Sequence, residues 1–232
     1  MAGTLIVALD LDTRGEAERL VERLGDAADF YKIGYQSFYG GDGLALGKTL
    51  LGAGKRVFFD LKLLDIDNTV EKGAAAIAAT GANMLTVHAY PKALAAAARG
   101  ASGSGLTILG VTVLTSMDDG DLADAGYGRD AAGLVALRAS QIRAAGIGGV
   151  VCAPGEAAMV RELVGPSLDI VTPGIRPAGA ARDDQKRVMG PAAALAAGAT
   201  HLVVGRPITA APDPQAAVAA IRAEMAGGRR VA

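Results

Sequence analysis

The chain has 232 residues, 51% of them hydrophobic, and its 23 basic and 24 acidic side chains leave a net charge of −1. Because the two signs are mixed along the chain, no basic patch or stripe indicates a nucleic-acid partner. The only cysteine, Cys152, lies in an apolar run and is expected to be a buried structural thiol in a reducing compartment. Residues 4–9 predict a strand too short to cross a membrane, and nothing there resembles a signal peptide, so we expect a cytoplasmic protein without a membrane partner.

Short β-branched, apolar runs alternate with longer Ala- and Leu-rich runs along the whole chain. Strands are predicted at 4–10, 29–34, 56–62, 83–88, 106–113, 149–153, 168–172 and 201–205. Helices are predicted at 14–25, 43–54, 68–80, 91–100, 130–145, 155–164, 190–198 and 213–226. Eight strand–helix pairs without a linker predict an α/β fold, a (β/α)₈ TIM barrel forming one catalytic domain over 1–232.

A doubly wound open sheet is the alternative to the barrel. It would require a glycine-rich phosphate turn after the first strand, and the segment 9–13, Leu-Asp-Leu-Asp-Thr, is not one. In a barrel, the active site lies at the carboxyl ends of the strands. We therefore expect the polar residues that follow the separate strands to meet at one rim.

The first two strands each carry a charge near their carboxyl ends. Asp10 could cap the next helix, but Asp12 or Thr13 can also do so, which leaves Asp10 available for binding. Lys32, in the segment Tyr-Lys-Ile-Gly, is a charge embedded in an apolar strand. A surface lysine at a strand end is the alternative interpretation.

The segment 60–69, Asp-Leu-Lys-Leu-Leu-Asp-Ile-Asp-Asn-Thr, is the most informative in the chain. Asp60 and Lys62 share one face of a strand, so a carboxylate and an ammonium converge on one point. Asp65 follows in the turn and can point elsewhere. An ordinary ion pair is the alternative, but together with Lys32 these residues predict an alternating network in which every charge has an opposite neighbour.

The loops after strands seven and eight predict a phosphate site. Gly174 and Gly205 allow backbone N–H groups to approach an anion, and Arg206 offers a planar guanidinium to its oxygens. The long segment 174–188 contains Arg176 and Gln185 and predicts a lid, with a solvated basic loop as the alternative.

The two histidines do not predict a metal site. His88 and His201 lie on distant strands, and His201 opens its strand, at the rim away from the expected site. No Gly-x-Gly-x-x-Gly, Walker or zinc pattern occurs in the sequence. We therefore expect neither a metal nor an organic cofactor.

Several segments, in order, resemble the orotidine 5′-phosphate decarboxylase family over nearly the whole chain. The family signature D-x-K-x-x-D-I-x-N-T stands at 60–69. The other matching segments are 7–10, 31–34, 111–116, 172–177, 183–188 and 204–209. The chain departs from the family at Asp67, where proline is usual, at Gly190, where threonine is usual, and at 88–91, which lacks the usual glycines.

The resemblance implies cofactor-independent decarboxylation of orotidine 5′-monophosphate to UMP, the last step of de novo pyrimidine synthesis, by a homodimer with shared sites. Lys62 would be the proton donor, with Asp60 near the substrate carboxylate. The resemblance further implies that Asp10 and Lys32 bind the ribose and that Thr115 and Ser116 bind the pyrimidine. It implies that Gln185, Gly205 and Arg206 bind the phosphate, with a lid contact by Arg176. Asp65, Ile66 and Thr69 would contact the neighbouring subunit's site. The alternative is a magnesium-dependent sugar-phosphate decarboxylase or aldolase of the same barrel superfamily, which shares the D-x-K-x-x-D pattern.

Overall fold

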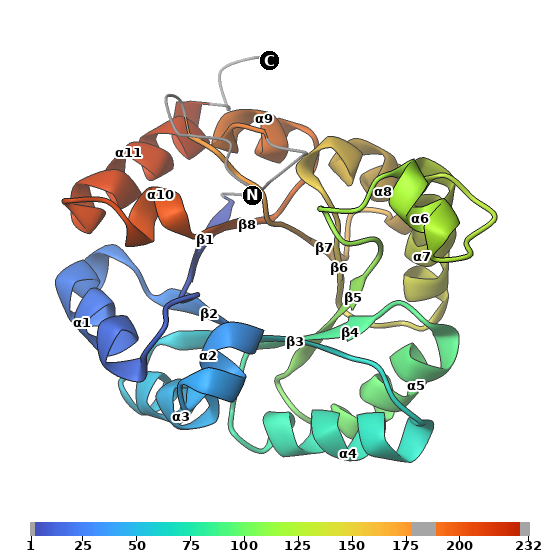
Figure 1. The fold of residues 1–232 in the computed structure, drawn as a ribbon, viewed down its shortest axis with the longest axis horizontal. Helices are drawn as coiled ribbons and strands as arrows, with labels where there is room; N and C mark the ends of the chain where they lie inside the picture. Colours follow the sequence, from blue (N-terminus) through green and yellow to red (C-terminus); the bar gives the residue numbers. More distant parts are fainter. Residues whose placement is uncertain (1–2, 178–188, 228–232) are drawn as a thin grey trace.

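The computed structural model describes residues 3–177 and 189–227, and within them eight parallel strands close into a barrel in sequence order (Figure 1). The strands are β1 (Thr4–Ala8), β2 (Phe30–Gly34), β3 (Arg56–Leu63), β4 (Met84–His88), β5 (Thr107–Val111), β6 (Gly149–Val151), β7 (Asp169–Thr172) and β8 (His201–Val204). The closed barrel confirms the predicted TIM fold and rules out the doubly wound sheet.

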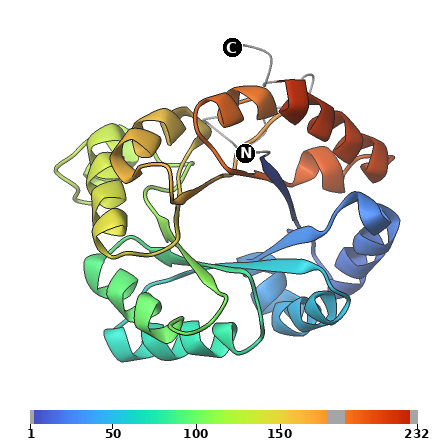
Figure 2. The same ribbon diagram turned by 180° about the vertical axis from the view of Figure 1, so that it is seen from behind.

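Helices surround the barrel on all sides, as both views of the ribbon show (Figures 1 and 2). They are α1 (Arg14–Leu24), α2 (Tyr35–Gly40), α3 (Gly43–Gly52), α4 (Asp67–Ala78), α5 (Pro91–Gly100), α6 (Asp119–Asp124), α7 (Ala131–Ala144), α8 (Ala157–Val164), α9 (Pro191–Ala196), α10 (Arg206–Thr209) and α11 (Pro214–Gly227). Two 3₁₀ turns, η1 (Gly25–Ala27) and η2 (Pro154–Glu156), complete the described elements. Among the described residues, no helix is long and apolar enough to cross a membrane.

The alternation of side chains along each strand divides the core into two parts. One face of every strand packs against the helices in a large apolar cluster. The opposite face fills the barrel interior with a smaller cluster, formed by Ile6, Ala8, Phe30, Phe58, Met84, Leu109, Val171 and Val203. Successive side chains of a strand point to opposite faces. The inward-facing residues nearer the carboxyl ends of the strands therefore line the space at that end of the barrel.

The element boundaries differ from the sequence prediction by a few residues. The first strand ends at Ala8 rather than at residue 10, so Asp10 lies in the loop that follows it. The short helices α2, α6 and α10 were not predicted. Each has only four to six residues, too few to display a helical period in the sequence. Two of them carry a start signal: α6 has a capping box formed by Asp118 and Asp121, and α10 has a proline in its first turn.

Candidate active site

A cavity of about 440 Å³ opens at the carboxyl ends of the strands, within the size range of small-molecule sites. Its wall at β1, β2 and β3 is charged, whereas the wall formed by β5 to β8 is mostly apolar. The residues that line it are Ala8, Asp10, Lys32, Gln36, Phe58, Asp60, Lys62, Val111, Val113, Leu114, Thr115, Val151, Val171, Pro173, Gly174, Arg176, Val203, Gly205, Arg206 and Thr209. The strand residues among them continue the inward-facing positions of the barrel interior.

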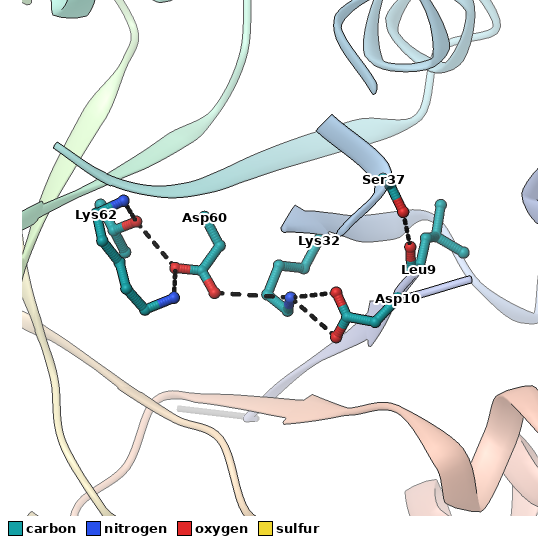
Figure 3. Close-up of polar contacts among 7 residues, drawn as sticks. Leu9, Asp10, Lys32, Ser37, Asp60 and Lys62 are labelled. Carbon is teal, nitrogen blue, oxygen red and sulfur yellow. Dashed lines mark hydrogen bonds and ion pairs between the residues drawn. The ribbon is translucent and has the colours of Figure 1, made fainter. Parts of the chain in front are cut away.

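Four charged side chains form a row across the charged wall (Figure 3). Lys32 Nζ lies 2.9 Å from Asp10 Oδ1 and 3.6 Å from Asp60 Oδ2. The second oxygen of Asp60, Oδ1, lies 2.8 Å from Lys62 Nζ. We call this row, Asp10–Lys32–Asp60–Lys62, the charged array. Its signs alternate, as the sequence predicted, but within this chain Asp10 rather than Asp65 is the fourth member.

The charged array holds its inner members ionised despite their burial. Burial alone would lower the pKa of the Lys32 ammonium, but Asp60 and Asp10 outweigh burial and raise this pKa above its ordinary value. Burial alone would raise the pKa of the Asp60 carboxyl, but Lys32 and Lys62 outweigh burial and keep this pKa below its ordinary value. Asp60 is therefore a carboxylate at neutral pH. It lies beside the Lys62 ammonium, and Lys62 lines the cavity.

Asp10 takes part in the array because another residue caps the next helix. The Thr13 hydroxyl accepts a hydrogen bond from Glu16 N, and the Glu16 carboxylate accepts one from Thr13 N. This capping box confirms that Asp10 is not required as a cap. Asp10 instead pairs with Lys32 through both carboxylate oxygens, at 2.9 and 3.2 Å.

Gly34, at the end of β2, is a part of this geometry that sequence analysis missed. A Cβ atom at this position would lie 2.9 Å from Asp10 Oδ1 and 3.0 Å from Lys32 Nζ. A side chain there would therefore displace one end of the charged array. The sequence offers only the glycine itself as a signal, and a glycine at a strand end is more often explained by the turn that follows.

Thr86, on β4, is a second residue that sequence analysis missed. Its side chain is fully buried, and its hydroxyl lies 2.9 Å from Asp60 Oδ1 and 2.9 Å from Lys62 N. A threonine within an apolar strand was a weak signal, because threonine is common in strands. Lys62 itself has a left-handed backbone, with φ of 44°, a conformation that costs a non-glycine residue roughly 1–2 kcal/mol.

Asp65 lies outside the cavity in this chain. Its side chain is exposed, and its Oδ1 accepts a hydrogen bond from Ile66 N at 2.6 Å. It lines two open grooves beside the cavity, one shared with Lys62, Thr69 and His88, the other shared with Ile66 and Tyr90 among others. Within the described residues, Asp65 makes no ion pair with Lys62.

The predicted phosphate residues that the structure describes lie in the loops after β7 and β8. Gly174, Arg176, Gly205 and Arg206 all line it, and Gly205 is the N-cap residue of α10. Thr115 also lines the cavity, whereas Ser116 is exposed and does not. Gln185 lies outside the described residues, as does most of the predicted lid. Gln36, which was not predicted, lines the cavity and donates a hydrogen bond to Asp12 at 2.6 Å.

The histidines occupy opposite ends of the barrel, as expected. His88 lies beside the charged array, and burial together with Lys62 and Arg138 lowers its pKa, which favours the neutral ring. His201 Nδ1 lies 2.9 Å from the Thr200 hydroxyl and 3.6 Å from Asp169 at the amino-terminal end. Within residues 3–177 and 189–227, no group of three or more His, Cys, Asp or Glu side chains is placed to hold a metal ion.

Comparisons with known proteins agree with the sequence resemblance. The family model described as "Orotidine 5'-phosphate decarboxylase / HUMPS family" matches residues 3–221. The chain is 59% identical over 225 residues to an orotidine 5′-phosphate decarboxylase of Rhodopseudomonas palustris, covering 97% of this chain and 94% of that one. It is 60% identical over 225 residues to a protein of the same name from a Methylobacterium species, covering 96% of this chain and 95% of that one.

A solved structure supports the same assignment. The crystal structure of orotidine 5′-phosphate decarboxylase from Lactobacillus acidophilus has a TM-score of 0.85 and 37% identity to this chain, covering 96% of this chain and 99% of that one. The barrel, its cavity and the sequence similarity over nearly the full length therefore lead to one conclusion. The chain belongs to the orotidine 5′-phosphate decarboxylase / HUMPS family.

Proposed function

We propose that this protein is a carboxy-lyase that converts orotidine 5′-monophosphate to UMP and CO₂, the last step of de novo pyrimidine synthesis. The observation that carries the proposal is the charged array, which ends in the Lys62 ammonium at the cavity. The relatives with about 60% identity bear the name of this activity.

The reaction requires a positive charge and a proton at one carbon atom. Loss of CO₂ leaves an electron pair at C6 of the pyrimidine, with no adjacent carbonyl to delocalise it. The Lys62 ammonium can stabilise this charge as it develops and then transfer a proton to C6. Asp60, 2.8 Å from Lys62 Nζ, holds the ammonium in place and would face the substrate carboxylate. No metal or organic cofactor is needed for these steps.

The rest of the nucleotide would bind along the same cavity and at its rim. Asp10 and Lys32 would bind the ribose hydroxyls, and Thr115 with Ser116 would bind the pyrimidine edge. Gly205 and Arg206 at the start of α10 would bind the phosphate, assisted by Gln185 and by Arg176 at the lid. Because the phosphate is remote from C6, its binding energy can be used to order the site around the reacting carbon.

We also propose that the protein is a homodimer with shared active sites. Two apolar side chains of the loop that carries Asp65, Leu64 and Ile66, are 52% and 71% exposed, and Tyr39 nearby is 78% exposed. An apolar surface of this kind around a groove is typical of a protein interface. In such a dimer, Asp65, Ile66 and Thr69 would contact the partner's cavity, which explains why Asp65 does not line its own.

Subunit mixing tests the shared site. Inactive Asp65→Asn subunits are combined with inactive Lys62→Ala subunits, and exchange is confirmed by mass spectrometry. If sites are shared, each mixed dimer has one site with both defects and one site with neither, so activity returns to about one wild-type site per mixed dimer. If Asp65 serves its own subunit, both sites stay defective, and the absence of recovery would refute the shared site.

Two broader assignments complete the proposal. We propose that residues 1–232 form one catalytic domain, since the matched region 3–221 contains all eight strands of the barrel. We propose that the protein acts in the cytoplasm without a nucleic-acid or membrane partner, since its single cysteine, Cys152, is buried, as is usual for a structural thiol in a reducing compartment.

One assay tests the proposed reaction against the alternative within the superfamily. The ultraviolet absorbance of orotidine 5′-monophosphate is followed with purified protein, with and without EDTA. We expect conversion to UMP that EDTA does not reduce. Absence of conversion, combined with magnesium-dependent turnover of a sugar phosphate, would replace the decarboxylase with a sugar-phosphate enzyme.

A further inference from the structure

The contact between β3 and β4 is irregular at the residues of β3 that contain Asp60 and Lys62, the last two members of the charged array. Phe59 pairs with Leu85, and the next pair is Leu63 with Val87. The chain thus advances four residues along β3 while it advances two along β4. The residues Asp60, Leu61 and Lys62 therefore form a bulge, and Thr86 is the single β4 residue opposite it.

A bulge leaves backbone groups without partners in the ladder. Here the Thr86 hydroxyl accepts the hydrogen bond of one such group, the Lys62 N–H. Lys62 N, which has no regular strand partner here, donates to Thr86 Oγ1 at 2.9 Å. The same hydroxyl donates its own hydrogen to Asp60 Oδ1 at 2.9 Å. One buried hydroxyl thus connects the backbone of the lysine to the side chain of the aspartate.

These two bonds act on the same pair that the proposed reaction uses. Lys62 Nζ also binds Asp60 Oδ1, at 2.8 Å. The three contacts close a ring from Lys62 N through Thr86 Oγ1 and Asp60 Oδ1 back to Lys62 Nζ. The ring limits where the ammonium can lie. The Lys62 backbone within it has a left-handed φ of 44°, which few residues other than glycine adopt.

We propose that Thr86 is a positioning residue of the active site: its hydroxyl holds the β3 bulge and the Asp60 carboxylate so that the Lys62 ammonium is fixed against the reacting carbon. The role rests on the proposed decarboxylation. Thr86 does not line the cavity, so it acts through Asp60 and Lys62 and not by contact with the substrate.

Removal of the hydroxyl should lower the turnover number and leave substrate binding largely intact. Thr86→Val keeps the shape and loses the hydroxyl, and we expect kcat to fall roughly 10- to 100-fold, since misplacement of a reacting group by about 1 Å has effects of this size. KM should change by less than about threefold, because the phosphate and ribose contacts remain. Thr86→Ser, which keeps the hydroxyl, should retain kcat within about threefold of the wild type.

A matched control separates positioning from packing. Thr172, in β7, is also fully buried, and its hydroxyl donates to His201 O at 3.5 Å, away from the charged array. Thr172→Val makes the same chemical change and should leave kcat unaltered. If Thr86→Val does not fold, Thr86→Ala and Thr86→Ser are compared instead, because both remove the methyl group and only serine keeps the oxygen.

A second measurement does not depend on activity. Hydrogen exchange at the Lys62 amide, followed by NMR, should be at least about tenfold faster in Thr86→Val or Thr86→Ala than in the wild type and Thr86→Ser, since the amide loses its acceptor. Unchanged exchange, or a kcat in Thr86→Val above half the wild-type value, would overturn the proposal. An inactive wild type would instead overturn the proposed reaction, and the exchange experiment would still decide the role of Thr86.

Discussion

The two ends of the barrel use charged side chains in different ways. At the carboxyl end, the inner members of the charged array, Lys32 and Asp60, are largely buried, the four members pair with one another, and the array faces an open cavity. At the amino end, Arg56 pairs with Asp29 at 2.9 Å on the exposed surface and stacks over the Phe30 ring at 4.4 Å. The first arrangement keeps charges available for a ligand, whereas the second ties neighbouring strands together.

Arg161 shows the structural use of charge most clearly. Its guanidinium donates hydrogen bonds to the backbone carbonyls of Gly165, Leu168 and Gly198, which precede β7 and β8. Within the described part of the chain, its hydrogen-bond partners are all backbone carbonyls. A charge whose partners are all backbone groups, such as Arg161, stabilises the fold. Charged side chains that pair with one another beside a cavity can exchange those contacts for contacts with a substrate.

The sharpest way to test this difference is to replace Lys62, near the carboxyl end of β3, and Lys55, which directly precedes β3. Lys62→Ala should leave the fold intact and reduce kcat well beyond the roughly 10²–10⁴ of ordinary acid–base catalysis, because the proton donor and the charge facing the carbanion are the same group. Lys55→Ala removes an ammonium that binds Gly25 O and Ala28 O at the other end. It should lower the melting temperature and leave kcat near wild type. A Lys62→Ala variant with a tenth of the wild-type kcat would contradict the assignment.

A second pair of variants compares arginines at the two ends. Arg206→Ala should lower kcat/KM for orotidine 5′-monophosphate by about 10- to 100-fold, since a lost charge-assisted hydrogen bond is worth about 1.5–3 kcal/mol. It should change kcat/KM for orotidine, which lacks the phosphate, by much less. Arg56→Ala should affect neither substrate. Equal losses on both substrates in Arg206→Ala would show that Arg206 has a structural role.

Gly34→Ala tests whether the close packing within the charged array matters. The added Cβ, 2.9 Å from Asp10 Oδ1 and 3.0 Å from Lys32 Nζ, must displace the ribose-binding pair. We expect kcat/KM to fall by about tenfold, measured by steady-state kinetics. Gly52→Ala is the control, because a Cβ there would meet no described atom within 4 Å. Wild-type kinetics in Gly34→Ala would show that the array tolerates displacement.

The smallest effect on activity is expected at Arg161. Arg161→Ala leaves the carbonyls of Gly165, Leu168 and Gly198 without this donor, and we expect a loss of about 2–3 kcal/mol of folding free energy. Because these groups lie at the amino end, kcat below the melting temperature should stay within about twofold of wild type. Denaturant unfolding and kinetics on the same sample measure both quantities. A large drop in kcat with unchanged stability would contradict a purely structural role for Arg161.

The barrel and most of its site could be predicted from local patterns. Strand alternation, helix signals and the size of the repeat depend on neighbours in sequence, so the closed order β1 to β8 followed the predicted one. Asp10, Lys32, Asp60 and Lys62 were found because each is a charge within an apolar strand or directly after one. The short helices α2, α6 and α10 were missed because helices of four to six residues show no period.

Other features depended on contacts between segments far apart in sequence. Thr86 is 26 residues from Asp60, and only the bulge in β3 brings its hydroxyl to both Asp60 and Lys62. Gly34 matters because a Cβ there would lie 2.9 Å from Asp10 Oδ1 and 3.0 Å from Lys32 Nζ, a closeness that no sequence spacing reveals. Asp65 was placed in an alternating network, whereas this chain turns it away from its own cavity.

By itself, the sequence determined the family, the barrel and the chemical types of the array, because these follow from residue type, periodicity and motif order. Only the tertiary structure decided which charges pair and which backbone is bent to bring them together. The physical reason is that an ion pair depends on distances of about 3 Å between side chains on separate strands. Those distances are set by register, bulges and the absence of a Cβ at Gly34.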